Sequence, residues 1–116
     1  MLDFDRITGF YERALAGVTQ RQAVIGHNVA NQSTPGYKAK RVQFEEALVD
    51  AVRKGKRFED VKFPIAEDLA PAGPTGNNVN IEYEWMMMEQ NRLVHSVLTK
   101  ALGGTFSSMV KAIRSR

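Results

Sequence analysis

Two histidines are the side chains best suited to acid–base or metal chemistry, and their positions favour neither. His27 and His95 fall in different predicted helices, and neither belongs to a His-x-x-x-His or Glu-x-x-His grouping. The candidate nucleophiles Ser33 and Thr34 follow His27 by about one and a half helical turns, which would direct them away from its ring. We therefore expect no catalytic residue and no metal site, and a packed or interface role for His95.

Phosphate chemistry is the next possibility. Residues 73–76 are rich in glycine but lack both a preceding strand and the Lys-Ser/Thr ending of a phosphate-binding loop, so we expect no bound cofactor. Two basic runs, at residues 38–41 and 53–57, could contact nucleic acid. Acidic residues interleave with both runs, which favours a solvated or interface surface. A small, basic helical-hairpin adaptor that binds nucleic acid or protein in the cytoplasm remains the alternative function.

Composition sets broad limits on the protein class. The chain has 116 residues, with 43% hydrophobic and 25% charged residues, which suits one small folded domain. Its formal net charge of +3 permits a nucleic-acid or membrane partner without demanding one. There is no cysteine, and no apolar stretch approaches the length of a transmembrane helix. The amino-terminal residues lack the pattern of a secretory signal, so we expect any export to use no cleaved signal peptide.

Long helices are predicted at both ends of the chain, because apolar residues recur there in steps of three and four. The first runs over residues 3–31, and Gly9, Gly17 and Gly26 in it could allow the close approach of a neighbouring helix. The second opens at Asn78 or Asn80 as its N-cap, and a kink is expected at Gly103-Gly104. The apolar stripes consist of Phe4, Ile7, Tyr11, Ala14, Val18, Ile25 and Val29 in the first helix, and of Ile81, Trp85, Met88, Leu102, Phe106, Met109 and Ile113 in the second.

The middle of the chain is predicted to be irregular. Thr34-Pro35-Gly36-Tyr37 has the residue preference of a type II turn, since Gly36 can adopt the positive φ that this turn requires. An extended segment over residues 38–44 and a short helix over residues 44–54 follow. Prolines and glycines punctuate residues 55–78, which we interpret as a loop or weak hairpin in which Phe58, Val61, Phe63 and Ile65 could form one short strand.

The predicted fold is therefore mainly α, with long terminal helices packed as an antiparallel, coiled-coil-like pair around a loop-rich insert. We divide the chain into an amino-terminal assembly helix (1–33), a turn, short helix and insert (34–78), and a carboxyl-terminal assembly helix (79–116). Such a pair buries only one seam, so each helix keeps apolar surface for other chains. The three consecutive methionines after Trp85 cannot all face one core, which favours a second partner over simple gap-filling. The glutamines and asparagines of both helices, among them Asn28 and Asn91, fit a solvated surface or a channel wall. Glu82 and Glu84 fall in the first turn of the second helix, as is typical of a helix start.

The segment after the first helix also carries a family resemblance. Residues 28–37 resemble the Asn-Ile-Ala-Asn-x-x-Thr-Pro-Gly-Tyr signature near the amino end of bacterial flagellar rod and hook proteins. The segment Gly-Asn-Asn-Val-Asn-Ile-Glu at residues 76–82 is similar to the start of the second helix in proximal rod members of that family. The residues that match the signature are Asn28, Ala30, Asn31, Thr34, Pro35, Gly36 and Tyr37.

This resemblance implies a structural subunit and not an enzyme. It implies a place in the rod of the flagellar basal body, which spans the periplasm, with export by the flagellar type III apparatus. The implied partners are other copies of the chain, other proximal and distal rod proteins, the basal adaptor between rod and membrane ring, and the export apparatus. It implies neither a nucleic-acid partner nor a small-molecule substrate.

Overall fold

The computed structural model describes residues 3–115, so Met1, Leu2 and Arg116, at the ends of the first and last predicted units, lie outside the described residues. The mainly α fold with two long terminal helices and a small antiparallel sheet is confirmed. The elements in chain order are α1 (Phe4–Ala30), β1 (Lys40–Val42), α2 (Phe44–Lys54), a short 3-10 helix η1 (Phe58–Asp60), β2 (Ile65–Glu67) and α3 (Ile81–Arg114).

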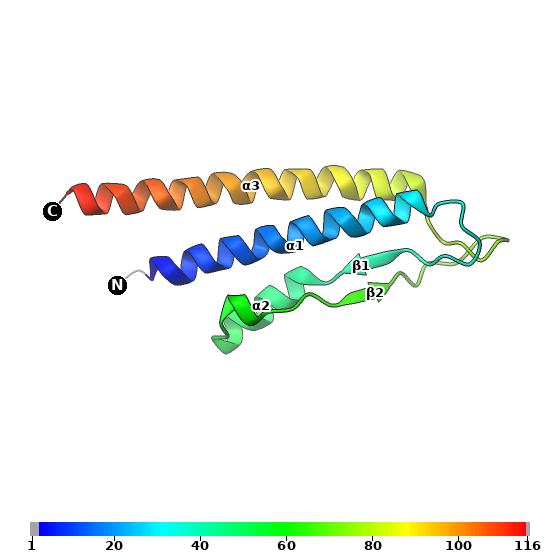
Figure 1. Cartoon of the computed structure of the whole chain (residues 1–116), viewed down its shortest axis with the longest axis horizontal. Helices are drawn as coiled ribbons and strands as arrows, with labels where there is room; N and C mark the ends of the chain where they lie inside the picture. Colours follow the sequence, from blue (N-terminus) through cyan, green and yellow to red (C-terminus); the bar gives the residue numbers. More distant parts are fainter. Residues whose placement is uncertain (1–2, 116) are drawn as a thin grey trace.

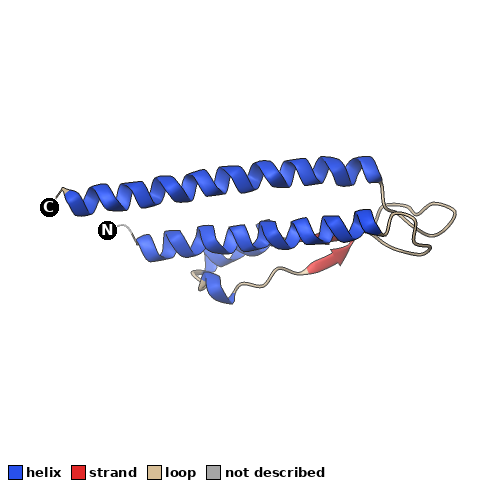
Figure 2. Ribbon diagram, turned by 45° about the horizontal axis from the view of Figure 1, so that its top comes forward, coloured by secondary structure: helices blue, strands red, loops and turns tan. Residues whose placement is uncertain are grey.

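The long helices lie antiparallel, and α1 is the middle layer of the molecule. Figure 1 shows α3 along one side of α1 and the strands with α2 along the other, with both termini at one end and the connecting loops at the opposite end. Figure 2 shows the same order of layers from a second direction. The molecule measures 67 × 27 × 15 Å, so it is long and thin. Among the described residues, no helix has both the length and the apolar character to cross a membrane.

Side-chain caps fix where the two long helices begin. The Asp3 carboxylate accepts a hydrogen bond from the backbone amide of Arg6 at 3.0 Å. The Asn80 side chain accepts one from the amide of Tyr83 at 3.2 Å. Both bonds satisfy amides that have no partner inside the first helical turn. Asn80 is therefore the N-cap of α3, which resolves the choice between Asn78 and Asn80.

The expected kink at Gly103-Gly104 is wrong. α3 runs without a break for 34 residues, from Ile81 to Arg114, and Figures 1 and 2 show it as one straight helix. Each glycine lowers helix stability by about 1 kcal/mol relative to alanine, but glycine retains the backbone N–H that proline lacks. A Cβ added at either glycine would meet nothing within 4 Å outside the local helix backbone, so no neighbouring group forces a bend there.

The insert differs from the single short strand predicted for Phe58, Val61, Phe63 and Ile65. That prediction is wrong, because Phe58 begins η1 and only Ile65 of the four lies in a strand. Phe58, Val61 and Phe63 are all buried. A regular strand would turn residues 58 and 61 to opposite faces, so burying both requires the backbone to turn between them. β2 instead pairs antiparallel with β1, with Arg41 opposite Ala66.

The apolar core lies between α1, α2 and the segment that contains η1. Phe44 and Phe63 meet edge to face with ring centroids 5.8 Å apart. The guanidinium of Arg13 lies over the Phe63 ring, and its Nε donates to the Val61 carbonyl at 2.8 Å. The core cluster consists of Ala14, Val18, Val24, Val42, Phe44, Leu48, Ala51, Phe58, Val61 and Phe63. α2 and the insert are thus held to α1 mainly by apolar packing.

Gly17 allows α2 to approach α1 closely. A Cβ built at Gly17 would lie 2.9 Å from ring atoms of Phe44, which is itself buried. The expected role of a glycine in close helix packing therefore holds at Gly17. It does not hold at Gly26, where an added Cβ would meet nothing within 4 Å.

We predict that Gly17→Ala lowers the free energy of unfolding by about 1–3 kcal/mol, because the overpacking against Phe44 outweighs the gain in helix propensity. The matched control Gly26→Ala should raise it by up to about 1 kcal/mol, since only propensity changes there. Urea unfolding followed by circular dichroism measures both. Equal stabilisation of the two variants would contradict the close contact between α1 and α2.

Candidate functional site

The signature segment ends α1 and turns the chain back along it. The amide of Asn31 donates to the carbonyls of His27 and Asn28, and its side-chain Nδ2 donates to the His27 carbonyl at 2.8 Å. The Thr34 hydroxyl donates to Asn31 Oδ1 at 3.0 Å. In the turn that follows, Gly36 has φ +76° and the amide of Tyr37 donates to the Thr34 carbonyl at 3.2 Å. This is the geometry that a Pro-Gly pair favours.

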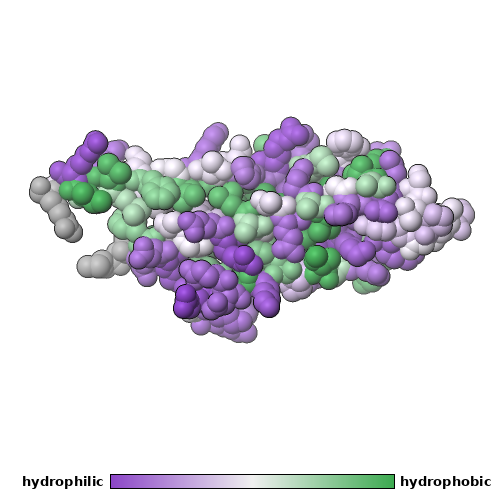
Figure 3. Space-filling model, in the orientation of Figure 1, coloured by the Kyte–Doolittle hydropathy of each residue, from purple (hydrophilic) through white to green (hydrophobic). Residues whose placement is uncertain are grey.

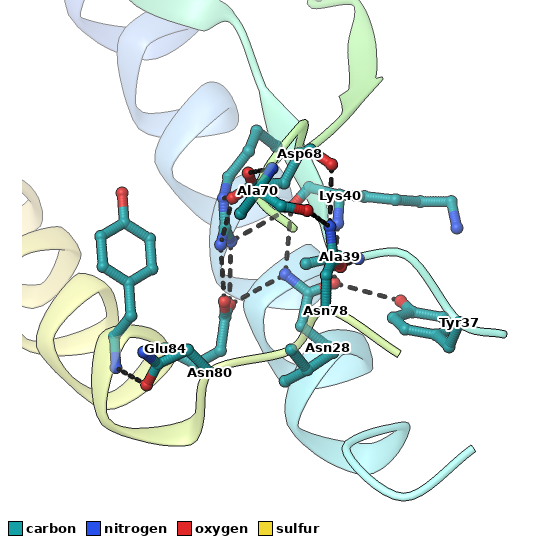
Figure 4. A network of polar contacts seen from close by, with 12 residues as sticks. Asn28, Tyr37, Ala39, Lys40, Asp68, Ala70, Asn78, Asn80 and Glu84 are labelled. Atoms are coloured by element: carbon teal, nitrogen blue, oxygen red, sulfur yellow. Dashed lines mark hydrogen bonds and ion pairs between the residues drawn. The ribbon is translucent and has the colours of Figure 1, made fainter. Parts of the chain in front are cut away.

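Asn28 is the centre of the site, where it is fully buried. Its Oδ1 accepts from the Tyr37 hydroxyl at 3.1 Å and from the Lys40 amide at 3.0 Å. Its Nδ2 donates to the Lys40 carbonyl at 3.0 Å and to Glu84 Oε1 at 2.9 Å. One amide side chain thereby uses all four of its hydrogen-bonding positions to join α1, the turn, β1 and α3 (Figure 4).

Glu84 brings a carboxylate from α3 into the same cluster, and it is also fully buried. Arg41 donates to both of its oxygens, from Nη1 at 2.9 Å and from Nη2 at 2.7 Å. Such a two-point pair is stronger and more directional than a single hydrogen bond. The Nε of Arg41 also donates to Asp68 Oδ2 at 3.1 Å. Arg41 therefore joins β1 to α3 and to the chain that follows β2.

The segment before α3 also binds the turn at residues 34–37, through the side chain of Asn77. Asn77 Nδ2 donates to the carbonyls of Asn31 and Thr34, both at 2.8 Å. Asn78 Oδ1 accepts from the Ala39 amide at 2.7 Å, and its Nδ2 donates to the Asp68 carbonyl at 2.9 Å. The two segments that carry the family resemblance, at residues 28–37 and 76–82, thus bind each other.

A second polar contact lies farther along the seam between α1 and α3. Asn91 is 1% exposed, and it sits seven residues after Glu84 on the same helix face. Its Oδ1 accepts from Arg21 Nε at 2.9 Å, and its Nδ2 donates to the Val18 carbonyl and to Gln22 Oε1, each at 2.9 Å. Glu84 and Asn91 together fix how far α3 is shifted along α1.

The electrostatics of the cluster follow from its burial. Burial raises the pKa of the Tyr37 hydroxyl, and the nearby negative charge of Glu84 raises it further. Burial alone would lower the pKa of Arg41, but its hydrogen bonds and charge interactions with Glu84 and Asp68 outweigh this and raise it. Arg41 therefore remains charged and Tyr37 remains a hydroxyl donor across the physiological pH range.

The signature residues divide into two groups. Asn28, Asn31, Thr34 and Tyr37 make the hydrogen bonds described above. Ala30 and the turn residues Pro35 and Gly36 are exposed and make no side-chain contribution to the network. The structure therefore brings the polar half of the signature together and leaves the other residues on the surface.

The predicted apolar stripes differ between the two helices. On α1, Ala14, Val18 and Ile25 are buried, and the remaining stripe residues (Phe4, Ile7, Tyr11 and Val29) are half-buried. On α3 no stripe residue is fully buried. Ile81, Met88, Leu102 and Met109 are half-buried, whereas Trp85, Phe106 and Ile113 are 55%, 49% and 69% exposed. The role of these stripes in assembly remains a prediction.

Some polar side chains were interpreted differently from the sequence. The expectation of a solvated or channel-facing surface is wrong for Asn28 and Asn91, which are buried. Glu84, in the first turn of α3, is also buried. The partners Arg41 and Asp68 were also missed as site residues. One usable signal was the heptad spacing of Glu84 and Asn91 on the seam side of α3, where apolar residues would be expected.

The cluster is suited to holding parts together and has no evident reactive group. Within residues 3–115, no buried side-chain nitrogen or oxygen lacks a hydrogen-bond partner. Saturated polar groups of this kind fix geometry, because any other arrangement leaves a buried group unpaired. His27 and His95 lie outside the cluster and are exposed, so His95 does not pack inside its own chain.

Comparison with known proteins agrees with this structural character. The family described as "Flagella basal body rod protein" matches residues 11–38, which include the signature. The flagellar basal body rod protein FlgB of Bacillus subtilis (strain 168) is 31% identical over 110 residues, covering 84% of this chain and 85% of the relative. The FlgB proteins of Borreliella burgdorferi (strain B31) and Escherichia coli (strain K12) are each 28% identical. These alignments cover 94% and 99% of this chain, and 96% and 99% of the relatives.

We predict that Glu84→Gln lowers the free energy of unfolding by about 2–3 kcal/mol. The amide keeps the size of the side chain but replaces one acceptor oxygen with a donor that faces other donors. Breaking a buried ion pair costs about 3–5 kcal/mol, and the remaining contact of Arg41 with Asp68 reduces that loss.

The matched control is Glu82→Gln, two residues earlier in α3 and exposed. It should change stability by no more than about 0.5 kcal/mol. Thermal and urea unfolding of both variants would provide the comparison. Similar losses in the two would mean that Glu84 is not an anchor of α3.

Proposed function

This chain belongs to the FlgB family of flagellar basal body rod proteins and is a structural subunit of the rod, and we propose that it polymerises through α1 and α3. In this proposal its neighbours are other copies of the chain and other proximal and distal rod proteins. The basal adaptor between rod and membrane ring is a further neighbour. The assembled tube crosses the periplasm, transmits the torque that drives motility and encloses the channel for exported subunits, and the chain itself leaves the cytoplasm through the flagellar export apparatus.

The burial pattern of α3 is the observation that carries this proposal. α3 has 34 residues, and its only fully buried side chains are the polar Glu84 and Asn91. Its apolar side chains are half-buried or exposed, including Leu93 and Val97 at 64% and 65% exposure. A solitary chain gains little from burying this helix, whereas neighbouring subunits could remove its apolar surface from water at about 25 cal/mol per Å2.

The surface of the chain supports assembly at the end where the termini lie. Figure 3 shows hydrophobic surface gathered along the carboxyl-terminal part of α3, at that end of the molecule. Contiguous apolar surface on a monomer marks an interaction site. Burial of this surface against neighbours would offset the conformational entropy that is lost when these segments become ordered.

The cytoplasmic adaptor is less well supported. Many basic residues that suggested nucleic-acid binding already have contacts inside the chain. Arg41 pairs with Glu84, Lys38 donates to the Gly76 carbonyl, and Lys56 pairs with Asp50. A surface for phosphates would need these cations free to replace counterions. The use of these cations inside the chain weakens the case for a phosphate-binding surface at residues 38–41 and 53–57, and favours a protein partner in place of nucleic acid.

Mass spectrometry of detergent-purified hook–basal bodies from the native cells tests the proposal directly. We expect the chain at a stoichiometry similar to that of other rod proteins. Recovery only in the soluble cytoplasmic fraction of flagellated cells would overturn the rod assignment and favour the adaptor.

We also predict that Phe106→Asp reduces incorporation into basal bodies at least tenfold while changing the free energy of unfolding by less than about 1 kcal/mol. Phe106 is 49% exposed in the single chain, so its removal weakens contacts with neighbours more than it weakens the fold. The control Ser108→Asp adds the same charge on another side of the same helix, at an exposed position. Normal motility and incorporation of Phe106→Asp would reject α3 as an assembly surface.

A further inference from the structure

An apolar groove lies between the three helices, on the α2 side of the α1–α3 pair. Its volume is about 450 Å3. Val49 and Val52 of α2 form one wall and are 56% and 54% exposed. Val94 and Leu98 of α3 form the other wall, and Phe10 of α1 lies among the lining residues. The groove is open because α2 packs on α1 and leaves its outer valines without a facing element.

The same chain also has a helical segment whose outer face has no neighbour among residues 3–115. Asn91 contacts Val18 and Gln22, and a constant rise of 1.5 Å per residue then places the start of α1 opposite roughly residue 107 of α3. The last turns of α3 therefore run past α1, as Figure 1 shows. Phe106, Val110 and Ile113 lie on this part in steps of four and three, which makes one exposed apolar stripe.

We propose that the groove receives residues 103–113 of α3 from a second copy of the chain. This inference rests on the proposed assembly through the terminal helices and adds the surface at which two copies meet. The stripe from Phe106 to Ile113 spans about 10 Å of helix, which fits within the roughly 14 Å between the lining residues Phe44 and Arg53 of α2. An apolar stripe of this length laid into an apolar groove is a common mode of helix recognition.

Charge complementarity supports a second copy as the occupant and sets its direction. Residues 90–116 contain no acidic residue and five basic ones. α2 carries Glu45 and Glu46 in its first turn and Arg53 and Lys54 in its last turn, so its charge changes sign along its length. We therefore orient the docked segment with Lys111 and Arg114 toward the amino end of α2, where Glu46 is exposed and Glu45 pairs with Arg21 of its own chain. Gly103 and Gly104, which carry no charge, then lie toward the carboxyl end of α2, which carries Arg53.

The segment cannot fill the groove of its own chain. α3 passes that groove at Val94 and Leu98. Val110 lies 12 residues beyond Leu98, which is about 18 Å along a continuous helix. A contact between the groove of one copy and the segment of another is heterologous, so it leaves a free groove and a free segment at the two ends of any chain of copies. Repetition of such a contact builds a helical assembly when it does not close into a ring.

The absence of native cysteine allows a direct test by disulfide crosslinking. The double variant Val49→Cys/Val110→Cys is introduced into the full chain in flagellated cells, and purified basal bodies are oxidised and run on a non-reducing gel. We expect disulfide-linked dimers and longer multimers that a reductant removes, since each copy carries both halves of the contact and disulfides need Cα atoms about 4.4–6.8 Å apart. The pair Val52→Cys/Phe106→Cys repeats the test independently.

The matched control is Val49→Cys/Ser108→Cys, in which the second cysteine sits on the side of α3 opposite Val110. Its multimer yield should be at least tenfold lower. Incorporation of both test pairs without multimers, or equal yields from test and control, would overturn the groove contact and leave the rod function standing. Absence of the unmodified chain from basal bodies would overturn both.

Discussion

A carboxylate that has no contact with water must be matched by donors, and the position of Glu84 therefore constrains much of this fold. Its two oxygens receive both terminal nitrogens of Arg41 and one hydrogen from Asn28. These donors come from β1 and α1, so the hydrogen-bonding needs of the Glu84 carboxylate are met only when both elements are in place. The turn after α1 follows from this requirement, because Asn28 can serve Glu84 and Lys40 together only if the chain returns along its own helix.

The polar seam determines register more than it adds stability. Buried ion pairs recover little net free energy, because desolvation offsets most of the attraction. A shift of α3 by one turn, however, would leave Glu84 and Asn91 buried against apolar groups. The best-attested use of such residues in helix pairs is to exclude wrong alignments. The apolar core, in contrast, lies under α1 with α2 and η1, where Phe44 and Phe63 meet.

Local patterns in the sequence predicted the local parts of the structure. The stripes and caps indicate both long helices, the Pro-Gly pair indicates the turn, and the span of α2 follows from its own apolar spacing. Non-local features were not predictable in this way. The pairing of Lys40 with Glu67 depends on two strands of three residues each. The burial of Glu84 depends on Arg41, which lies 43 positions away in the chain. A polar residue on a helix looks solvated until its partner is known.

The two ends of the molecule have opposite properties, and this asymmetry suits a subunit that must add to a growing tube. At the loop end, hydrogen bonds join α1, the turn, β1 and α3, so the register of the helices is set within one chain. At the other end α3 extends past α1 with Phe106 and Ile113 exposed, and the molecule is only 15 Å thick in its shortest direction. A single thin layer cannot bury those side chains by rearranging itself. Neighbouring subunits can bury them. In the proposed assembly the internally fixed end therefore defines the shape of the subunit, and the open end would gain burial and rigidity from its neighbours.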